Sequence, residues 1–232
     1  MEVNNVIDNF QLSLSRVADS QRAIAMRAYM KNQFEFLGIS APERRKACAA
    51  DIQELKTADP AQLLAIAQAL WACKEREYHY VAIDILAKHW RSLRPDDSPL
   101  LLLLAQQKSW WDTVDGLTGV IGDLLRKNLT GGRQIQISMD AALEHPDFWV
   151  RRIALLHQLG WRELTDVDRL FHYALALADE KEFFIRKAIG WALRDYAWHE
   201  PAAIHGFLQA NQSRFSGLTL REAAKNLKKL GE

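Results

Sequence analysis

The stretch KSWWDTVDGL, residues 108–117, places two tryptophans beside two aspartates. Trp111 and Asp115 are four residues apart, so on a helix they are stacked neighbours separated by one turn. An indole face attracts a cation, and a carboxylate stabilises nearby positive charge. This pair is therefore suited to a positively charged ligand or reaction centre.

The helix that carries this pair is expected over residues 109–127, with Ser109 as its N-cap. Trp111 and Asp115 then lie on a stripe that adjoins the apolar face. Asp112 falls in the first turn, where a carboxylate stabilises the helix dipole, so Asp115 is the functional candidate. The core stripe should consist of Trp110, Val114, Leu117, Ile121 and Leu124.

A second tryptophan, Trp191, has a similar setting on a helix expected over residues 183–197. It shares a polar stripe with Lys187 and Arg194. The alternative for either tryptophan is ordinary packing between helices. Arg152 has only apolar helical neighbours, so its side chain either extends to solvent or reaches a partner. The buried stripe of this second helix should be Ile185, Ile189, Ala192 and Tyr196.

These residues require helices to position them, and helical periodicity runs through almost the whole chain. Prolines stand where several helices would begin, and the connections are short. The fold class is therefore predicted to be all-α. Helices are expected over roughly 3–17, 20–36, 41–55, 60–72, 77–91, 98–106, 109–127, 133–144, 147–159, 166–178, 183–197, 201–210 and 218–229.

An internal repeat relates two of these helices. Residues 148–159 align with residues 183–193 at an offset of 35, and both begin with two aromatic residues, a β-branched residue and two basic residues. Such a repeat predicts a single domain over 1–232, an α-solenoid of antiparallel HEAT-like helix pairs; a bundle without true repeats is the alternative. The repeat phase predicts that one concave face carries Arg45, Tyr80, Asp115, Arg152 and Lys187.

Composition narrows the functional class. The formal net charge is only +1, so a nucleic-acid surface must come from the placement of charges. Two cysteines indicate a reducing compartment, and the seven histidines have no metal-ligand spacing, so no metal site is expected. No signal peptide or membrane span is recognised, which predicts a cytoplasmic protein. Residues 214–229 hold five basic side chains and one acidic side chain, Glu222.

The motifs together resemble one family, the AlkD-type DNA alkylation repair glycosylases. The similar segments are KSWWDTVD (108–115), WVRR (149–152), EFFIRKAIGWALRDY (182–196), AYMKNQFEFLGISAPERR (28–45) and EREYHYVAIDIL (75–86). They cover nearly the whole chain. The resemblance implies HEAT-like repeats that form a concave, positively charged DNA cleft.

The resemblance also implies an activity, base excision repair by hydrolysis of the N-glycosidic bond of positively charged N3- and N7-alkylpurines. Asp115 would be the catalytic carboxylate, and Trp111 and Trp191 the aromatic walls beside the lesion nucleotide. The alkylated purine already carries positive charge, so it leaves without a general acid. Members need no metal or cofactor.

The implied partner is double-stranded DNA that contains alkylated bases, bound by a monomer. Arg152 would hold a phosphate, and Tyr29 and Arg45 would line the cleft near the N-terminus. Lys187 and Arg194 are further expected DNA contacts. Two other classes remain open: a non-catalytic HEAT-repeat scaffold for DNA or protein, and a purely structural repeat protein in which the face of Trp111 is buried.

Overall fold

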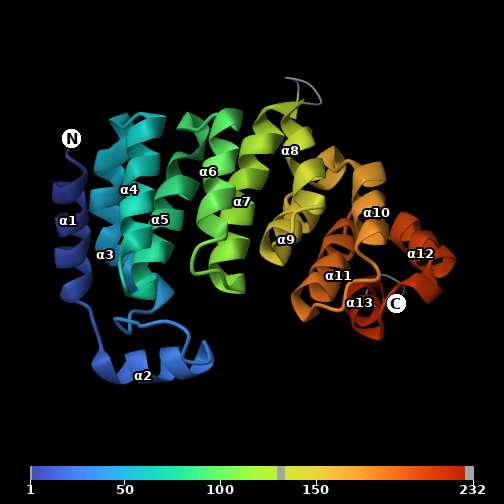
Figure 1. The fold of residues 1–232 in the computed structure, drawn as a ribbon, viewed down its shortest axis with the longest axis horizontal. Helices are drawn as coiled ribbons and strands as arrows, with labels where there is room; N and C mark the ends of the chain where they lie inside the picture. The colour runs from blue at the N-terminus through green and yellow to red at the C-terminus, as the bar shows by residue number, and fades with distance from the viewer. Residues whose placement is uncertain (1, 130–133, 228–232) are drawn as a thin grey trace. The chain divides into compact units, whose positions relative to one another are not determined.

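The computed structural model describes residues 2–129 and 134–227. These residues form α-helices joined by short turns and 3-10 segments, with one isolated β-bridge between Glu35 and Glu75 (Figure 1). The prediction of an all-α chain is confirmed. None of the described helices combines the length and the apolar character that crossing a bilayer requires.

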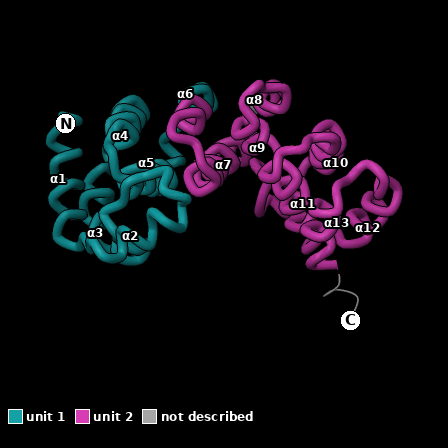
Figure 2. Tube along the Cα trace, turned by 60° about the horizontal axis from the view of Figure 1, so that its bottom comes forward, with its two compact units in different colours: residues 1–100 teal, residues 101–232 magenta. Residues whose placement is uncertain are grey.

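The contacts group the chain into two compact units, residues 1–100 and 101–232 (Figure 2). In the first unit α4 packs on α5, and α1 packs on both α3 and α4. This succession of neighbouring helices is the arrangement expected of helical repeats. The helices of this unit are α1 (Val3–Ser15), α2 (Ser20–Tyr29), α3 (Ala41–Glu54), α4 (Pro60–Ala72) and α5 (Arg76–His89).

The second unit is built around two helices, α9 and α11, which contact each other. Helices α7 and α8 pack on α9, while α12 and α13 pack on α11. Helix α6 (Ser98–Ala105) begins just before the unit boundary. The other helices are α7 (Trp111–Lys127), α8 (Gln134–Leu143), α9 (Phe148–Leu156), α10 (Val167–Ala176), α11 (Phe183–Ala197), α12 (Pro201–Ala210) and α13 (Gly217–Ala223).

Several expected helix boundaries need correction; among them, α9 ends at Leu156 and not at residue 159. Helix α2 ends at Tyr29, well before the expected residue 36, because Lys31 and Asn32 take left-handed backbone angles that stop a helix. The N-cap of α7 is Trp110, in extended backbone, and not Ser109. Helix α13 ends at Ala223, short of the expected residue 229. Residue 133 and residues 228–229 of the expected helices lie outside the described residues.

The predicted repeat is visible in the local structure of α9 and α11. Their N-caps, Asp147 and Glu182, are 35 positions apart, and each side chain accepts a hydrogen bond from the backbone N–H two residues later. Arg151 and Arg186, also 35 apart, each donate to the carbonyl six residues earlier. The offset read from the sequence therefore corresponds to two helices with the same start.

Candidate active site

An aromatic cluster joins the first turns of α7, α9 and α11. The ring of Trp110 lies 5.9 Å from that of Trp149 and 5.3 Å from that of Phe184. Trp149 and Phe184 are 4.8 Å apart, and Phe148 packs 4.5 Å from Trp149. Each aromatic pair adds to the stability from buried area. The three helix starts are thereby fixed beside one another, and with them the polar residues one turn further along.

The central polar contact is a two-point ion pair between α9 and α7. The Nε and Nη2 atoms of Arg152 donate to the two carboxylate oxygens of Asp115 at 2.8 and 2.9 Å. The Nη1 atom donates to the carbonyl oxygen of Phe184 at 2.6 Å. The side chain of Arg152 is 1% exposed and that of Asp115 is 27% exposed. A buried guanidinium requires such partners, and here it fixes the carboxylate while leaving part of it accessible.

Close packing of α7 on α9 allows this pair to form. Gly122, two turns after Asp115, lies against the backbone of His157: a Cβ at this position would be 2.3 Å from the His157 carbonyl oxygen. Only glycine fits such an approach. Gly122 therefore keeps α9 near enough for Arg152 to reach α7.

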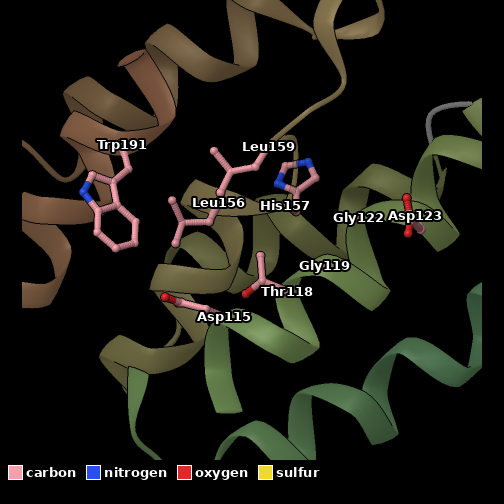
Figure 3. Close-up of a pocket in the computed structure, with 9 residues that line it drawn as sticks. All are labelled: Asp115, Thr118, Gly119, Gly122, Asp123, Leu156, His157, Leu159 and Trp191. Atoms are coloured by element: carbon pink, nitrogen blue, oxygen red, sulfur yellow. The ribbon is translucent and has the colours of Figure 1, made fainter. Parts of the chain in front are cut away.

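The accessible side of Asp115 borders a pocket of about 300 Å³ in the second unit (Figure 3). Trp191 from α11 stands at the same pocket, so two of the three expected catalytic residues are brought together. Trp111, half-buried at the first position of α7, is not among the residues that line it. The lining residues are Asp115, Thr118, Gly119, Gly122, Asp123, Leu156, His157, Leu159 and Trp191.

Positive charge surrounds the Trp191 indole. The guanidinium carbons of Arg152 and Arg194 lie 5.3 and 5.7 Å from the ring centroid, and the Lys187 ammonium lies 5.1 Å from it. Lys187 is also 5.6 Å from the ring of Phe183. These distances are within the range of cation–π attraction. The stripe predicted for α11 is thus confirmed as a tryptophan among cations, facing the same site as Asp115.

The repeat phase is therefore supported within the second unit, where Asp115, Arg152 and Lys187 gather around Trp191. The phosphate contact expected of Arg152 stays a prediction, and the structure shows other partners for its side chain. The guanidinium is buried and its Nε, Nη1 and Nη2 atoms already bind Asp115 and Phe184. The geometry is that of a residue that orients Asp115.

The expected DNA contacts in the first unit lie at its surface. Tyr29, the last residue of α2, is 74% exposed. The Arg45 side chain is 67% exposed, with its Nε 3.8 Å from Asp84, a carboxylate that Arg44 also binds at 3.1 Å. Their roles on DNA, and the single face that the repeat phase assigns to Arg45 and Tyr80 along with the residues of the second unit, stay predictions.

Sequence reasoning missed two features that shape the site. The Phe184 carbonyl, an acceptor for Arg152, gives no side-chain signal. Glu222 accepts a hydrogen bond from the Trp191 indole at 3.0 Å, and its only sequence signal is that it is the single acid in a basic segment.

Comparison with known proteins supports the resemblance. The family model described as DNA alkylation repair enzyme matches residues 10–227. A solved structure described as a predicted DNA alkylation repair enzyme from Enterococcus faecalis is similar, with a TM-score of 0.83 and 32% sequence identity over 91% of this chain and 97% of that chain. Comparison with curated proteins gives no match.

Proposed function

Because the chain belongs to the family of DNA alkylation repair enzymes, we propose that it is a DNA glycosylase. Its substrates are positively charged N3- and N7-alkylpurines in double-stranded DNA, and its reaction is hydrolysis of their N-glycosidic bond. The observation that carries this proposal is the Asp115 carboxylate, held by the buried Arg152 at a pocket that also contains Trp191.

The reaction needs stabilisation of one developing charge. As the bond between C1′ and the purine nitrogen breaks, its electron pair moves onto the base and neutralises the alkylpurine cation. Positive charge then appears on the sugar as an oxocarbenium-like state. Asp115 stabilises this charge and orients the attacking water, whose oxygen bonds to C1′ while its proton passes to the carboxylate or to solvent. The products are a neutral base and an abasic site.

Arg152 supports Asp115 without blocking it. Each oxygen of an ionised carboxylate has a second acceptor position beyond the one used by Arg152. Both oxygens therefore remain able to bind a water or face a cation. A preorganised group of this kind contributes about 3–4 kcal/mol to transition-state stabilisation.

In binding, the aromatic residues contact the cationic nucleotide and the cations contact the DNA backbone. The indoles of Trp111 and Trp191 favour a cationic nucleotide by roughly 0.5–2 kcal/mol each. Lys187, Arg194, Tyr29 and Arg45 are proposed to contact DNA, with the cations acting on its phosphates. The protein acts as a monomer and requires no metal or cofactor.

Base release is the direct test. The purified chain is incubated with duplex DNA that contains 3-methyladenine or 7-methylguanine, and the free base is quantified by chromatography. We expect release well above spontaneous depurination for both lesions. Release at the spontaneous rate for both, with DNA binding intact, would instead identify a non-catalytic HEAT-repeat scaffold.

A further inference from the structure

The indole nitrogen of Trp191 makes a hydrogen bond to a neighbouring helix. Its Nε1–H donates to Oε2 of Glu222, on α13, at 3.0 Å. Figure 3 shows this nitrogen on the edge of the ring that points away from the other pocket residues. Tryptophan has no other side-chain donor. The hydrogen bond therefore fixes the ring while leaving its carbon surface to the pocket.

Glu222 is a buried carboxylate with three donors. Besides Trp191, its Oε2 accepts from Nη1 of Arg194 at 3.1 Å, and its Oε1 accepts from Nζ of Lys225 at 2.6 Å. Burial raises the pKa of Glu222, but the hydrogen bonds from Lys225 and Trp191 and the charges of Lys225 and Arg194 outweigh it, so the pKa is lowered. Glu222 is consequently an anion at neutral pH.

The backbone of α13 is itself fixed against α11 at this point. A Cβ on Gly190, the residue before Trp191, would be 2.5 Å from the Cβ of Glu222, so glycine allows the two helices to touch. The Thr219 hydroxyl donates to the Arg186 carbonyl at 3.0 Å. One turn after Glu222, the side-chain amide of Asn226 also donates to an α11 carbonyl, at 3.1 Å. These contacts fix the position of Glu222 relative to the indole.

The negative charge of Glu222 also affects which ligands can approach Trp191. Three cationic side chains lie within 6 Å of the indole centroid, and they would repel a cationic nucleotide brought to the same ring. Asp115 offsets the charge of Arg152. Glu222 lies 3.1 Å from Arg194 and 2.6 Å from Lys225, so it offsets part of the positive charge of these two side chains.

We propose that Glu222 is a positioning residue of the active site: it fixes the plane of Trp191 and offsets part of the positive charge near the ring, so that the site prefers a cationic nucleotide. The inference rests on the proposed glycosylase function, in which Trp191 is an aromatic wall. Helix α13 would then contribute to the active site, although it is not among the helices that line the pocket.

A double-mutant cycle tests whether Glu222 acts through Trp191. Glu222→Gln keeps the size of the side chain but cannot accept all three hydrogen bonds, so it should lower single-turnover base release about tenfold, the usual effect of losing one hydrogen bond to a charged group. In a Trp191→Phe background the same change should cost clearly less, because phenylalanine has no N–H and only the charge of Glu222 is then lost. Equal losses in both backgrounds, or no loss in either, would overturn the proposal.

Binding to two abasic-site analogues tests the charge argument without chemistry. Glu222→Gln should weaken binding to DNA with a cationic pyrrolidine analogue about tenfold and leave binding to the neutral tetrahydrofuran analogue unchanged. Equal weakening of both would contradict a charge-selective role. Glu200→Gln, which removes an exposed carboxylate of the same unit at the start of α12, is the matched control and should change neither.

Failure of the proposed function and failure of the role of Glu222 can be told apart. If the wild-type chain releases no base, the proposed function fails, while the two analogues still test Glu222. If Glu222→Gln does not fold, the wild-type chain still tests the hydrogen bond. The measurement is the rate at which the Trp191 indole proton exchanges with solvent, and the signal is assigned by its absence in Trp191→Phe. Slow exchange supports the hydrogen bond to Glu222, and exchange at the rate of an exposed indole excludes it.

Discussion

At the scale of residues, the site consists of two carboxylates and several cations around one indole. Asp115 pairs with Arg152 and Glu222 pairs with Arg194. Asp115 keeps 27% of its side chain exposed, so it combines a fixed position with access to a reactant. Such preorganisation is what electrostatic catalysis requires, because the group need not reorient as charge develops.

Arg152 provides the first prediction at this scale. Arg152→Ala should lower single-turnover base release by tenfold or more, since Asp115 loses its two-point hydrogen bond, an effect of about 1.5–3 kcal/mol. The salt dependence of DNA affinity should stay unchanged, because the wild-type guanidinium is buried and three of its five N–H groups bind Asp115 and Phe184. Binding measured across a salt series checks this; a slope reduced by about 0.9 would instead reveal a lost phosphate contact.

At the scale of elements, the site depends on how closely α7, α9 and α11 approach. The aromatic cluster fixes their first turns, and two glycines allow contacts that any side chain would block. Gly122 meets the backbone of α9, and Gly190 meets α13. Small residues at these two points bring Arg152 and Glu222 within hydrogen-bond distance of their partners.

Gly122→Ala should therefore destabilise the protein and reduce base release together. The added methyl group would lie 2.3 Å from the His157 carbonyl oxygen, so α9 must shift, at a cost of about 1–3 kcal/mol. Gly119→Ala on the same helix is the matched control for stability. A Cβ there meets nothing within 4 Å, so it should leave stability unchanged or raise it by about 0.5–1 kcal/mol. Equal melting temperatures for the two variants would refute the close-packing argument.

His157, at the C-terminal end of α9, predicts a pH dependence of stability. Burial, with a smaller contribution from the charge of Arg169, lowers its pKa to about 4. Its Nδ1 lies 2.6 Å from the Ala154 carbonyl, so that nitrogen carries the proton of the neutral ring. The unfolded chain binds a further proton near pH 6.5 and the folded chain only near pH 4. The free energy of unfolding should therefore fall by up to about 1.4 kcal/mol per pH unit as the pH drops through this window.

Urea unfolding between pH 7.5 and pH 5 measures this contribution. In His157→Asn the decline should be smaller by the share of His157, because asparagine keeps a donor for Ala154 but does not titrate. His199→Asn, at an exposed position, is the control and should show the wild-type decline. If His157→Asn also follows the wild-type curve, His157 is not the source.

At the scale of the whole molecule, the chain is a sequence of helices in two compact units, with a net charge of only +1. DNA affinity must therefore arise from placed cations. Arg45 is exposed in the first unit, whereas Asp115 and Trp191 belong to the second.

Arg45→Ala is the test at this scale. If Arg45 contacts a phosphate, the variant should bind DNA more weakly, and its salt slope should fall by about 0.9. Its single-turnover rate at saturating DNA should equal that of the wild type, because the catalytic groups are unchanged. A lower rate with an unchanged slope would assign Arg45 a different role.

Most of the fold was predictable because its signals are local. Pro60 in a first turn, with Asp59 as its cap, marks a helix start from a few adjacent residues. The end of α2 was missed because Lys31 and Asn32 adopt left-handed angles without a glycine to announce them. Local pattern thus determines where most helices lie, but not every end.

The site was predictable only in part, for a related reason. The spacing of Trp111 and Asp115 is a local helical pattern, and the repeat offset selected Arg152 and Lys187. Contacts across helices leave no such pattern. The partner of Arg152, Asp115, lies 37 residues away in the sequence. The apolar residues next to Arg152 on its own helix therefore could not show whether its side chain is paired or exposed to solvent. The Glu222 contact, between α11 and α13, was equally hidden.

The most direct test of the central claim is single-turnover release of 7-methylguanine by the wild-type chain and by Asp115→Asn, at saturating duplex DNA. Asparagine keeps the size of the side chain but removes its charge. We predict a loss of at least about a hundredfold in rate, with DNA affinity nearly unchanged. Wild-type activity in Asp115→Asn would contradict the account, because the Asp115 carboxylate could then not be the group that stabilises the sugar cation.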